Sequence, residues 1–217
     1  MKVITAVFFD VDGTLADARL DISGAMNRVL KTLGRPEKSS DEISSYIGSG
    51  VKDLISKSLG ACGDDPVLVN RATALYEEEY LKRPADHAVL YPGVVNLLKA
   101  LPDKRKFILT NRYSNLASAL LGKLGIRGFF EDVFGGDDEE CIKPSSRVME
   151  KILPAVMVDK KEALIVGDMA IDVMTGKNSG VRTCWVTYGL GKKEDVLPLK
   201  PDYVIDSISE LGGIITP

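Results

Sequence analysis

The chain has 217 residues, 45% of them hydrophobic and 27% charged, which is typical of a globular protein with a sizeable core. Its formal net charge is −3 and it has no run of basic residues, so the sequence does not favour nucleic acid as a partner. Three scattered cysteines, Cys62, Cys141 and Cys184, argue against a disulfide framework or a cysteine-rich zinc site.

No segment has the pattern of a membrane or secretion signal. No window approaches the roughly 18 apolar residues that a membrane helix needs. About seven apolar residues precede Asp10, which is too few for the parts of a signal peptide. We therefore expect a cytoplasmic protein without a membrane partner.

The N-terminal segment predicts a buried strand that ends in two carboxylates. Apolar or small residues run almost unbroken from Val3 to Phe9, and Asp10, Asp12 and Gly13 follow. Such a run, ended by a glycine turn, is typical of a strand buried on both faces of a parallel sheet. Because ligands of these sheets bind beyond the carboxyl ends of the strands, Asp10 and Asp12 are candidate functional residues.

Four helices are expected next, with no strand candidate between them. Their apolar residues recur at three- and four-residue spacing, and capping signals such as the pair Ser39 and Glu42 mark their ends. The expected helices span residues 25–33, 39–47, 51–59 and 66–83. They predict a small helical bundle inserted into a sheet domain, with residues 17–86 as the insert and residues 1–16 and 87–217 as the core domain.

Strands and helices alternate through the rest of the chain. The expected strands span residues 106–110, 132–135, 163–166, 183–186 and 203–205, and the expected helices span residues 114–124, 145–153 and about 169–179. Repeated strand–helix units predict a parallel sheet with right-handed crossovers and helices on both faces. The expected fold is therefore α/β, with a doubly wound, Rossmann-like core and an inserted helical bundle.

Polar residues stand at four expected strand ends, where apolar ones would otherwise continue. They are Asp10 with Asp12, Thr110 with Asn111, Lys143 with Pro144, and Asp168 with Asp172. The carboxyl ends of parallel strands lie along one edge of a sheet, so these groups can converge although they are far apart in sequence.

Such a convergence is what a phosphoryl-transfer site requires. Asp10 is positioned to be a nucleophile, since carboxylates form aspartyl-phosphate intermediates. Asp12 can protonate the leaving alcohol and later deprotonate water. Lys143 would offset the charge of Asp10 and the phosphate. Asp168, with Asp172 one helical turn later, would complete an oxygen ligand set for Mg²⁺.

Other residues of the same segments are candidates for binding phosphate oxygens. Thr110 and Asn111 carry suitable polar side chains, and Gly13 and Thr14 belong to a turn whose backbone N–H groups can donate hydrogen bonds. Lys143 is expected to contribute to phosphate binding as well as to catalysis.

This arrangement closely resembles the haloacid dehalogenase-like hydrolase superfamily, most of whose members are phosphatases. Its four motifs occur in order as DVDGT from Asp10, Thr110-Asn111, Lys143-Pro144 and GDMAID from Gly167, and the resemblance covers essentially the whole chain. It implies a Mg²⁺-dependent phosphatase working through phospho-Asp10. The implied metal ligands are the Asp10 side chain, the Asp12 main-chain carbonyl and the Asp168 side chain. The helical insert is similar to the mobile cap of the family.

Three stretches are similar to stretches in phosphoglycolate phosphatases: Gly48 to Gly60, Tyr91 to Leu101 and Val133 to Pro144. This similarity favours 2-phosphoglycolate as the substrate. The acid at Asp12 argues against haloacid dehalogenases and phosphonatases, which lack one at that position. Met169 departs from the pattern, because Ser or Thr is common there.

Several alternatives stay open at this point. They are a phosphomutase similar to β-phosphoglucomutase, a phosphatase for another small metabolite, and a non-catalytic phosphate-binding module. A substrate that also carries a carboxylate needs a cation besides Lys143; Lys52, Arg19 and Arg112 are candidates, and the sequence does not choose among them. The loop Gly48-Ser49-Gly50 either reaches the ligand or is a plain turn. The sequence does not predict whether the protein is a monomer or a homodimer.

Overall fold

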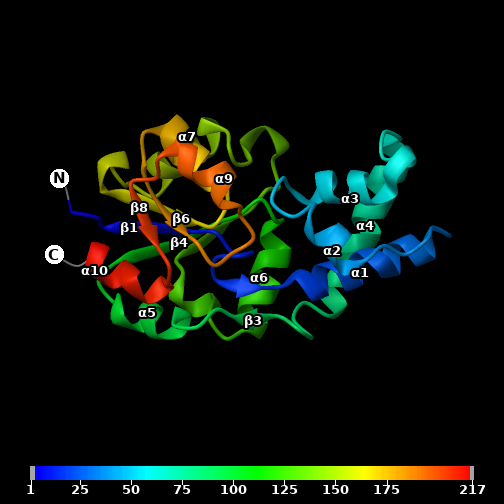
Figure 1. The fold of residues 1–217 in the computed structure, drawn as a ribbon, viewed down its shortest axis with the longest axis horizontal. Helices are drawn as coiled ribbons and strands as arrows, with labels where there is room; N and C mark the ends of the chain where they lie inside the picture. Colours follow the sequence, from blue (N-terminus) through cyan, green and yellow to red (C-terminus); the bar gives the residue numbers. More distant parts are fainter. Residues whose placement is uncertain (1–2, 216–217) are drawn as a thin grey trace.

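Six parallel strands form the central sheet of the structure, a computed structural model that describes residues 3–215 (Figure 1). The strands are β1 (Ala6–Phe9), β4 (Arg105–Leu109), β5 (Asp132–Phe134), β6 (Ala163–Gly167), β7 (Arg182–Val186) and β8 (Tyr203–Ile205). Their spatial order is β5-β4-β1-β6-β7-β8, and each neighbouring pair is parallel. After β1 the chain adds β4 and β5 on one side of it, and then β6, β7 and β8 on the other side. This order confirms the doubly wound α/β prediction.

The alternation of side chains along β1 explains why this strand lies at the centre. Val7 and Phe9 belong to the hydrophobic core on one face of the sheet, and Ala6 and Phe8 to the core on the other. All four are fully buried. Phe8 stacks on Phe107 of β4, with 4.9 Å between the ring centroids. A strand that is apolar on both faces needs helices on both faces.

Helices cover the two faces of the sheet in separate layers (Figure 1). On one face lie α5 (Val94–Ala100), α6 (Ser114–Lys123) and α10 (Leu211–Ile215); on the other lie α7 (Ser146–Ala155), α8 (Ala170–Ser179) and α9 (Lys193–Val196). Six short 3₁₀ turns span residues 60–62, 127–129, 139–141, 160–162, 197–199 and 208–210. The sequence patterns did not predict α5, α9 or α10.

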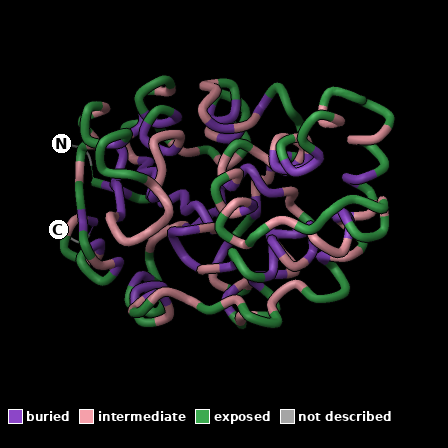
Figure 2. Tube along the Cα trace, turned by 45° about the vertical axis from the view of Figure 1, so that its right-hand side comes forward, coloured by how far each residue is buried: buried purple, intermediate pink, exposed green. Residues whose placement is uncertain are grey.

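The four expected helices of the insert are present. They are α1 (Arg19–Thr32), α2 (Ser40–Ser44), α3 (Val51–Leu59) and α4 (Pro66–Lys82), and together they form the helical insert. The predicted cap at Ser39 is formed, because its hydroxyl accepts a hydrogen bond from the Glu42 N–H at 3.1 Å. Figure 2 shows buried residues both in the sheet and within this insert. Met26, Ile55 and Tyr76 are among them.

A short antiparallel ribbon, which the sequence analysis missed, joins the helical insert to the sheet. Strand β2 (Ala16–Asp17) pairs with β3 (Val89–Leu90) where the chain enters and leaves the insert. The buried carboxylate of Asp21 accepts hydrogen bonds from the backbone N–H groups of Asp86 and His87 at 3.1 Å. These bonds tie the two crossing segments together. The ribbon lies at the predicted domain boundaries, 16/17 and 86/87, and the division into domains stays a prediction.

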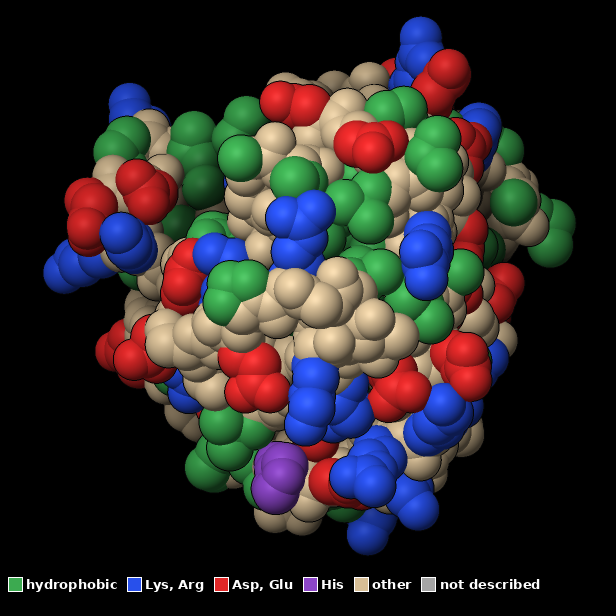
Figure 3. All heavy atoms as spheres, turned by 90° about the vertical axis from the view of Figure 1, so that its right-hand side faces the viewer, with side chains coloured by type: hydrophobic (Ala, Val, Ile, Leu, Met, Phe, Trp, Pro, Cys, Tyr) green, Lys and Arg blue, Asp and Glu red, His purple; other side chains and the backbone are tan. Residues whose placement is uncertain are grey.

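Two properties of the exterior bear on partners. Acidic and basic side chains are interspersed over the face at the outer end of the helical insert (Figure 3). Among residues 3–215, none of the helices combines the length and the apolar character needed to cross a membrane.

Candidate active site

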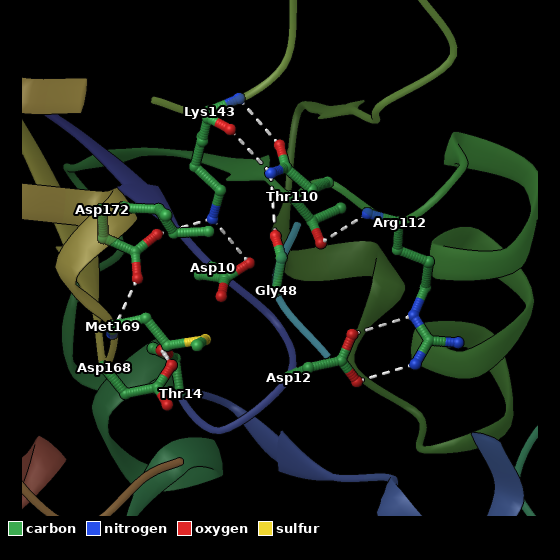
Figure 4. A network of polar contacts seen from close by, with 12 residues as sticks. Asp10, Asp12, Thr14, Gly48, Thr110, Arg112, Lys143, Asp168, Met169 and Asp172 are labelled. Atoms are coloured by element: carbon green, nitrogen blue, oxygen red, sulfur yellow. Dashed lines mark hydrogen bonds and ion pairs between the residues drawn. The ribbon is translucent and has the colours of Figure 1, made fainter. Parts of the chain in front are cut away.

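Three carboxylates from two neighbouring strand ends meet in the interior (Figure 4). Asp10 follows β1 and Asp168 follows β6, and these strands are paired in register, with Phe9 opposite Val166. Asp172 lies in the first turn of α8. Carboxylate oxygens of Asp10, Asp168 and Asp172 lie within 4.8 Å of one another, and all three residues are buried. The predicted convergence of these segments is present in the structure.

Lys143 inserts its ammonium group between two of these acids. Its Nζ atom lies 2.9 Å from Asp10 Oδ1 and 2.6 Å from Asp172 Oδ1, and its side chain is 1% exposed. Burial opposes the charged form of Lys143, but the combined attraction of Asp10 and Asp172 outweighs it and raises the pKa of the ammonium. The expectation that Lys143 stands at a strand end is wrong: eight residues lie between it and Phe134, the last residue of β5, and a 3₁₀ turn intervenes.

Asn111 fixes the loop that carries Lys143. Its side-chain oxygen accepts from the Lys143 N–H at 2.8 Å, and its Nδ2 donates to the carbonyls of Lys143 and Gly48, both at 2.9 Å. Both amide hydrogens are therefore engaged with the backbone, and only the backbone N–H of Asn111 is left for a phosphate oxygen. The sequence placed Asn111 at the phosphate and gave no sign of these three bonds.

Asp168 lies in a close-fitting cradle of backbone. Its carboxylate accepts hydrogen bonds from Thr14 Oγ1 at 3.0 Å, Leu190 N at 2.6 Å and Gly191 N at 3.3 Å. Gly13 has φ +87°, and a Cβ atom there would lie 2.2 Å from Asp168 Oδ2. Gly13 is therefore needed both for the turn and for the space beside the carboxylate.

The donors of the Asp12 turn are engaged within the structure. The Gly13 N–H donates to the Ala16 carbonyl at 3.0 Å, and the Thr14 N–H donates to the Val11 carbonyl at 3.3 Å. Thr14 also directs its hydroxyl to Asp168. Gly13 and Thr14 were predicted to contact phosphate. Their N–H groups instead donate within the turn, and the Thr14 hydroxyl donates to Asp168.

The carboxylate cluster carries more negative than positive charge. Three buried acids share one lysine, and burial together with mutual repulsion raises the pKa of both Asp10 and Asp168. Closely spaced carboxylate oxygens with surplus negative charge are the donor set of a hard divalent cation. The residues therefore fit a divalent metal. Both oxygens of Asp172 are already engaged, by Lys143 and by the Met169 N–H at 2.9 Å.

Asp12 lies in different surroundings, paired with Arg112. Arg112 donates from Nη2 to Asp12 Oδ1 at 2.7 Å and from Nε to Asp12 Oδ2 at 3.0 Å. The guanidinium carbon lies 4.6 Å from the centre of the Tyr80 ring. Burial disfavours the charge of Arg112, but Asp12 and the neighbouring tyrosine oxygens raise its pKa well above the usual value. Arg112 was only one of three candidate cations in the sequence.

A cleft opens between these polar groups and the helical insert. Thr110, at the end of β4, lines it, and its hydroxyl oxygen accepts from the Arg112 N–H at 3.2 Å. The polar wall comes from the core, and the facing wall is mostly apolar. The apolar wall consists of Ile22, Ile47, Val51, Leu54 and Tyr76. An apolar wall that faces a few convergent polar groups is typical of a small-molecule site.

The Gly48 loop brings the helical insert against the core. Gly48 has φ +119°, and a Cβ atom there would lie 2.8 Å from the sulfur of Met169. The Gly48 carbonyl accepts from Asn111, and both Gly48 and Gly50 line the cleft. Met169, which departs from the motif pattern, therefore packs against this loop. The loop lines the cleft, and its contact with a ligand stays a prediction.

Comparisons with known proteins agree with this geometry. A family model described as haloacid dehalogenase-like hydrolase matches residues 7–186. The chain is 33% identical to a phosphoglycolate phosphatase of Caulobacter vibrioides, over 94% of this chain and 88% of that protein. It is 32% identical to a phosphoglycolate phosphatase of Vibrio cholerae, over 99% of this chain and 98% of that protein.

Solved structures share the fold over the full length. A crystal structure described as a predicted phosphoglycolate phosphatase from Haemophilus somnus superposes with a TM-score of 0.87, at 24% identity, covering 99% of each chain. CbbY from Rhodobacter sphaeroides in complex with phosphate superposes with a TM-score of 0.83, at 25% identity, covering 96% of each chain.

Proposed function

The chain belongs to the haloacid dehalogenase-like hydrolases and is a phosphatase, and from this premise we propose that it hydrolyses 2-phosphoglycolate to glycolate and phosphate with Mg²⁺. The observation that carries the proposal is the contact between Asp10 and Lys143, 2.9 Å apart and buried beside Asp168. This contact holds a carboxylate nucleophile at a strand end, next to the positive charge that a phosphate needs. The names of the relatives support the choice of substrate.

The proposed reaction has two steps, both centred on Asp10. An Asp10 oxygen attacks phosphorus, the bond from phosphorus to the glycolate oxygen breaks, and Asp12 donates a proton to that oxygen. The product of this step is an aspartyl phosphate on Asp10. Water then attacks the phosphorus, Asp12 takes the proton of the water, and the bond from phosphorus to Asp10 breaks. Free phosphate and the original Asp10 carboxylate result.

The metal in this proposal is Mg²⁺, held by the side chains of Asp10 and Asp168 and the main-chain carbonyl of Asp12. When bound, it supplies positive charge that offsets the carboxylates and the phosphate. Asp172 supports the site by holding Lys143 at 2.6 Å. The raised pKa values of Asp10 and Asp168 support a cation at this place, because burial and then mutual repulsion disfavour the ionised carboxylates, and a bound cation would offset both.

Phosphate is proposed to bind between Lys143 and the end of β4. The Thr110 hydroxyl and the Asn111 backbone N–H face the phosphate oxygens, and Lys143 neutralises part of their charge. Gly13 and Thr14 contribute by holding Asp168 in place. The proposal includes a mobile cap domain, residues 17–86, on a core of residues 1–16 and 87–217. It also includes action in the cytoplasm.

A phosphate-release assay with Mg²⁺ tests this function. The panel contains 2-phosphoglycolate, β-glucose 1-phosphate and other small phosphomonoesters, and kcat/KM is expected to be highest for 2-phosphoglycolate. Asp10→Asn should release no phosphate, whereas Lys99→Met, a change at an exposed position of α5, should behave as the wild type. Activity that survives Asp10→Asn overturns the nucleophile.

The same panel separates the other candidate functions. Formation of a sugar bisphosphate from β-glucose 1-phosphate, with little free phosphate, identifies a phosphomutase. Preferred hydrolysis of another ester replaces the substrate and keeps the phosphatase. No turnover of any ester, with ligands still raising the unfolding temperature, identifies a phosphate-binding module.

A further inference from the structure

One buried donor of the cleft has no partner. Among the buried side-chain nitrogen and oxygen atoms of residues 3–215, Arg112 Nη1 is the one without a hydrogen bond. The Arg112 side chain is 4% exposed and lines the cleft. Figure 4 shows Nη1 as the guanidinium nitrogen directed away from Asp12. Because nearly all buried polar atoms of native proteins are paired, an unpaired guanidinium N–H beside a cleft points to a ligand.

The surroundings of Arg112 suit a planar, singly charged partner. Two nitrogens form a fork on Asp12 at 2.7 and 3.0 Å, and the Tyr80 ring packs against the guanidinium face. The side chain is therefore held in one orientation before any ligand binds, which limits the entropy lost on binding. A guanidinium fork is complementary to a carboxylate, and one carboxylate, that of Asp12, is already on it.

The structure distinguishes Arg112 from the other cations that the sequence proposed. Arg19 forms an ion pair with Asp17 at 2.7 Å in the ribbon region, and it lines a separate surface groove. Lys52 pairs with Glu139 outside the cleft. Within the described part of the chain, the cations that line the cleft are thus Arg112 and Lys143.

Lys143 is paired with two acids, whereas Arg112 is paired with one. Lys143 contacts two acids, Asp10 and Asp172, in a cluster that already lacks positive charge. Arg112 is paired with one acid, Asp12, lies beside Tyr80 and keeps a spare nitrogen. Arg112 also follows Thr110 by two residues, so their Cα atoms lie within about 7 Å. A substrate whose phosphate is at Thr110 needs only a short linker to bring a second anion to Arg112.

We propose that Arg112 is the residue that selects substrates with a carboxylate, and that this carboxylate displaces Asp12 from the guanidinium. Both Asp12 oxygens accept from Arg112, and these two bonds hold the carboxylate against the guanidinium. A substrate carboxylate that binds the neighbouring fork of Nη1 and Nη2 competes with Asp12 for Nη2. Asp12 is then free to turn toward the reacting oxygen, which couples recognition to proton transfer. The inference rests on the proposed function, because it assigns Asp12 the proton-transfer role.

Binding of two inert ligands tests the inference without turnover. Phosphonoacetate carries a phosphonate and a carboxylate on one methylene, and phosphonoacetamide has the same shape with a neutral amide. Calorimetry on the full chain with excess Mg²⁺ should give a Kd at least about tenfold lower for phosphonoacetate, because charge-assisted hydrogen bonds exceed neutral ones. A ratio near one in the wild type overturns the proposal, whatever any variant does.

Three variants assign the preference to its residues. Arg112→Gln should bring the Kd ratio to about one, and Arg112→Lys should keep only part of the preference, because lysine has no fork. Arg19→Gln is the matched control and should keep the wild-type ratio. A preference that survives Arg112→Gln overturns the assignment. Thermal unfolding of each variant checks that it is folded; if Arg112→Gln is not, the wild-type ratio and the Asp12→Asn variant carry the test.

Two further variants test whether the ligand carboxylate displaces Asp12 from Arg112. Asp12→Asn removes the competing carboxylate, so the preference for phosphonoacetate should increase beyond the wild-type ratio. Asp10→Asn removes a charge nearby that Arg112 does not contact, and it should increase the ratio less. Equal effects of the two changes overturn the displacement. Failure of the proposed function is recognised separately: the protein then keeps the ligand preference but does not hydrolyse 2-phosphoglycolate.

Discussion

The two acids at the end of β1 lie in opposite electrostatic surroundings. Asp10 belongs to the carboxylate side, where Lys143 pairs with two of three buried acids. Asp12 belongs to the arginine side, where one acid faces Arg112 and a donor is left over. The first side lacks positive charge and suits a cation, while the second has a spare donor and suits an anion. Asp10 and Asp12 are two positions apart in the sequence, but the surroundings of Asp10 suit a metal ion and those of Asp12 suit an anion.

The largest effect is expected on the carboxylate side, from Lys143→Met. The change leaves the acids without their lysine, and breaking a buried ion pair costs about 3–5 kcal/mol of unfolding free energy. Urea unfolding in the absence of metal measures it. Lys99→Met, exposed on α5, is the control and should change stability little. A loss below about 1 kcal/mol for Lys143→Met would show that the cluster does not depend on this cation.

Mg²⁺ should stabilise the carboxylate side by the next largest amount. At 100 times its Kd, a ligand adds about 2.7 kcal/mol to the unfolding free energy. Asp168→Asn should lose most of this gain, and Asp195→Asn, at an exposed position of α9, should keep it. Thermal unfolding with MgCl₂ or with EDTA measures the difference. Equal stabilisation of wild type and Asp168→Asn contradicts the predicted ligand.

The same experiment has a pH dependence with a definite sign. The folded protein raises the pKa of Asp10 and Asp168 above their ordinary values, so ionising them costs the metal-free folded state stability. That cost is absent below the ordinary pKa of a carboxyl, and it grows as the pH rises toward the folded-state pKa. The gain from Mg²⁺ should therefore be larger at pH 8 than at pH 5. A gain that shrinks with rising pH has the wrong sign.

A smaller effect is expected on the arginine side, from Tyr80→Phe. The Tyr80 hydroxyl donates to the Pro84 carbonyl at 2.9 Å, and losing one such bond costs about 1 kcal/mol. The ring stays against Arg112, so the preference for phosphonoacetate should be kept. Tyr80→Leu, which removes the ring, should weaken that preference. A ligand preference that is equal in both variants means that the ring contributes nothing to Arg112.

The smallest effect is expected outside both sides, from Lys52→Gln. Lys52 of α3 pairs with Glu139 of the core, and both side chains are substantially exposed. Exposed pairs contribute about 0–1 kcal/mol, and salt screens them. Urea unfolding at low and high NaCl should therefore show a small loss that disappears at high salt. A large loss of unfolding free energy that salt does not change would contradict the description of this contact as an exposed ion pair.

Local patterns were sufficient to predict most of the fold. The apolar run before Asp10 indicated a buried strand, and β1 is buried on both faces. Helical spacing and capping signals found α1 to α4, because these are properties of a few adjacent residues. Strands β2 and β3 have two residues each, which is too short to give a period. Their pairing depends on contacts between segments more than 70 residues apart.

The candidate site was predictable as a set of residues but not as a set of contacts. Sequence motifs brought Asp10 and Lys143 to one place, but not the loop that carries Lys143 past the end of β5. The hydrogen bond from the Asn111 side-chain amide to the Gly48 carbonyl depends on tertiary geometry. The choice of Arg112 among three cations likewise depends on where each side chain ends, and residue type carries no information about that.

The ribbon of β2 and β3 has a consequence for how the protein can be altered. Its pairs Ala16 with Leu90 and Asp17 with Val89 bring the two ends of the insert side by side, so the insert is attached at one place on the core. Segments with adjacent ends are readily exchanged between scaffolds. A transplanted insert would replace the apolar wall of the cleft and so change the shape of the cleft. Arg112 would stay behind with the core, so a chimaera should change the size of the accepted substrate and keep its demand for a second anion.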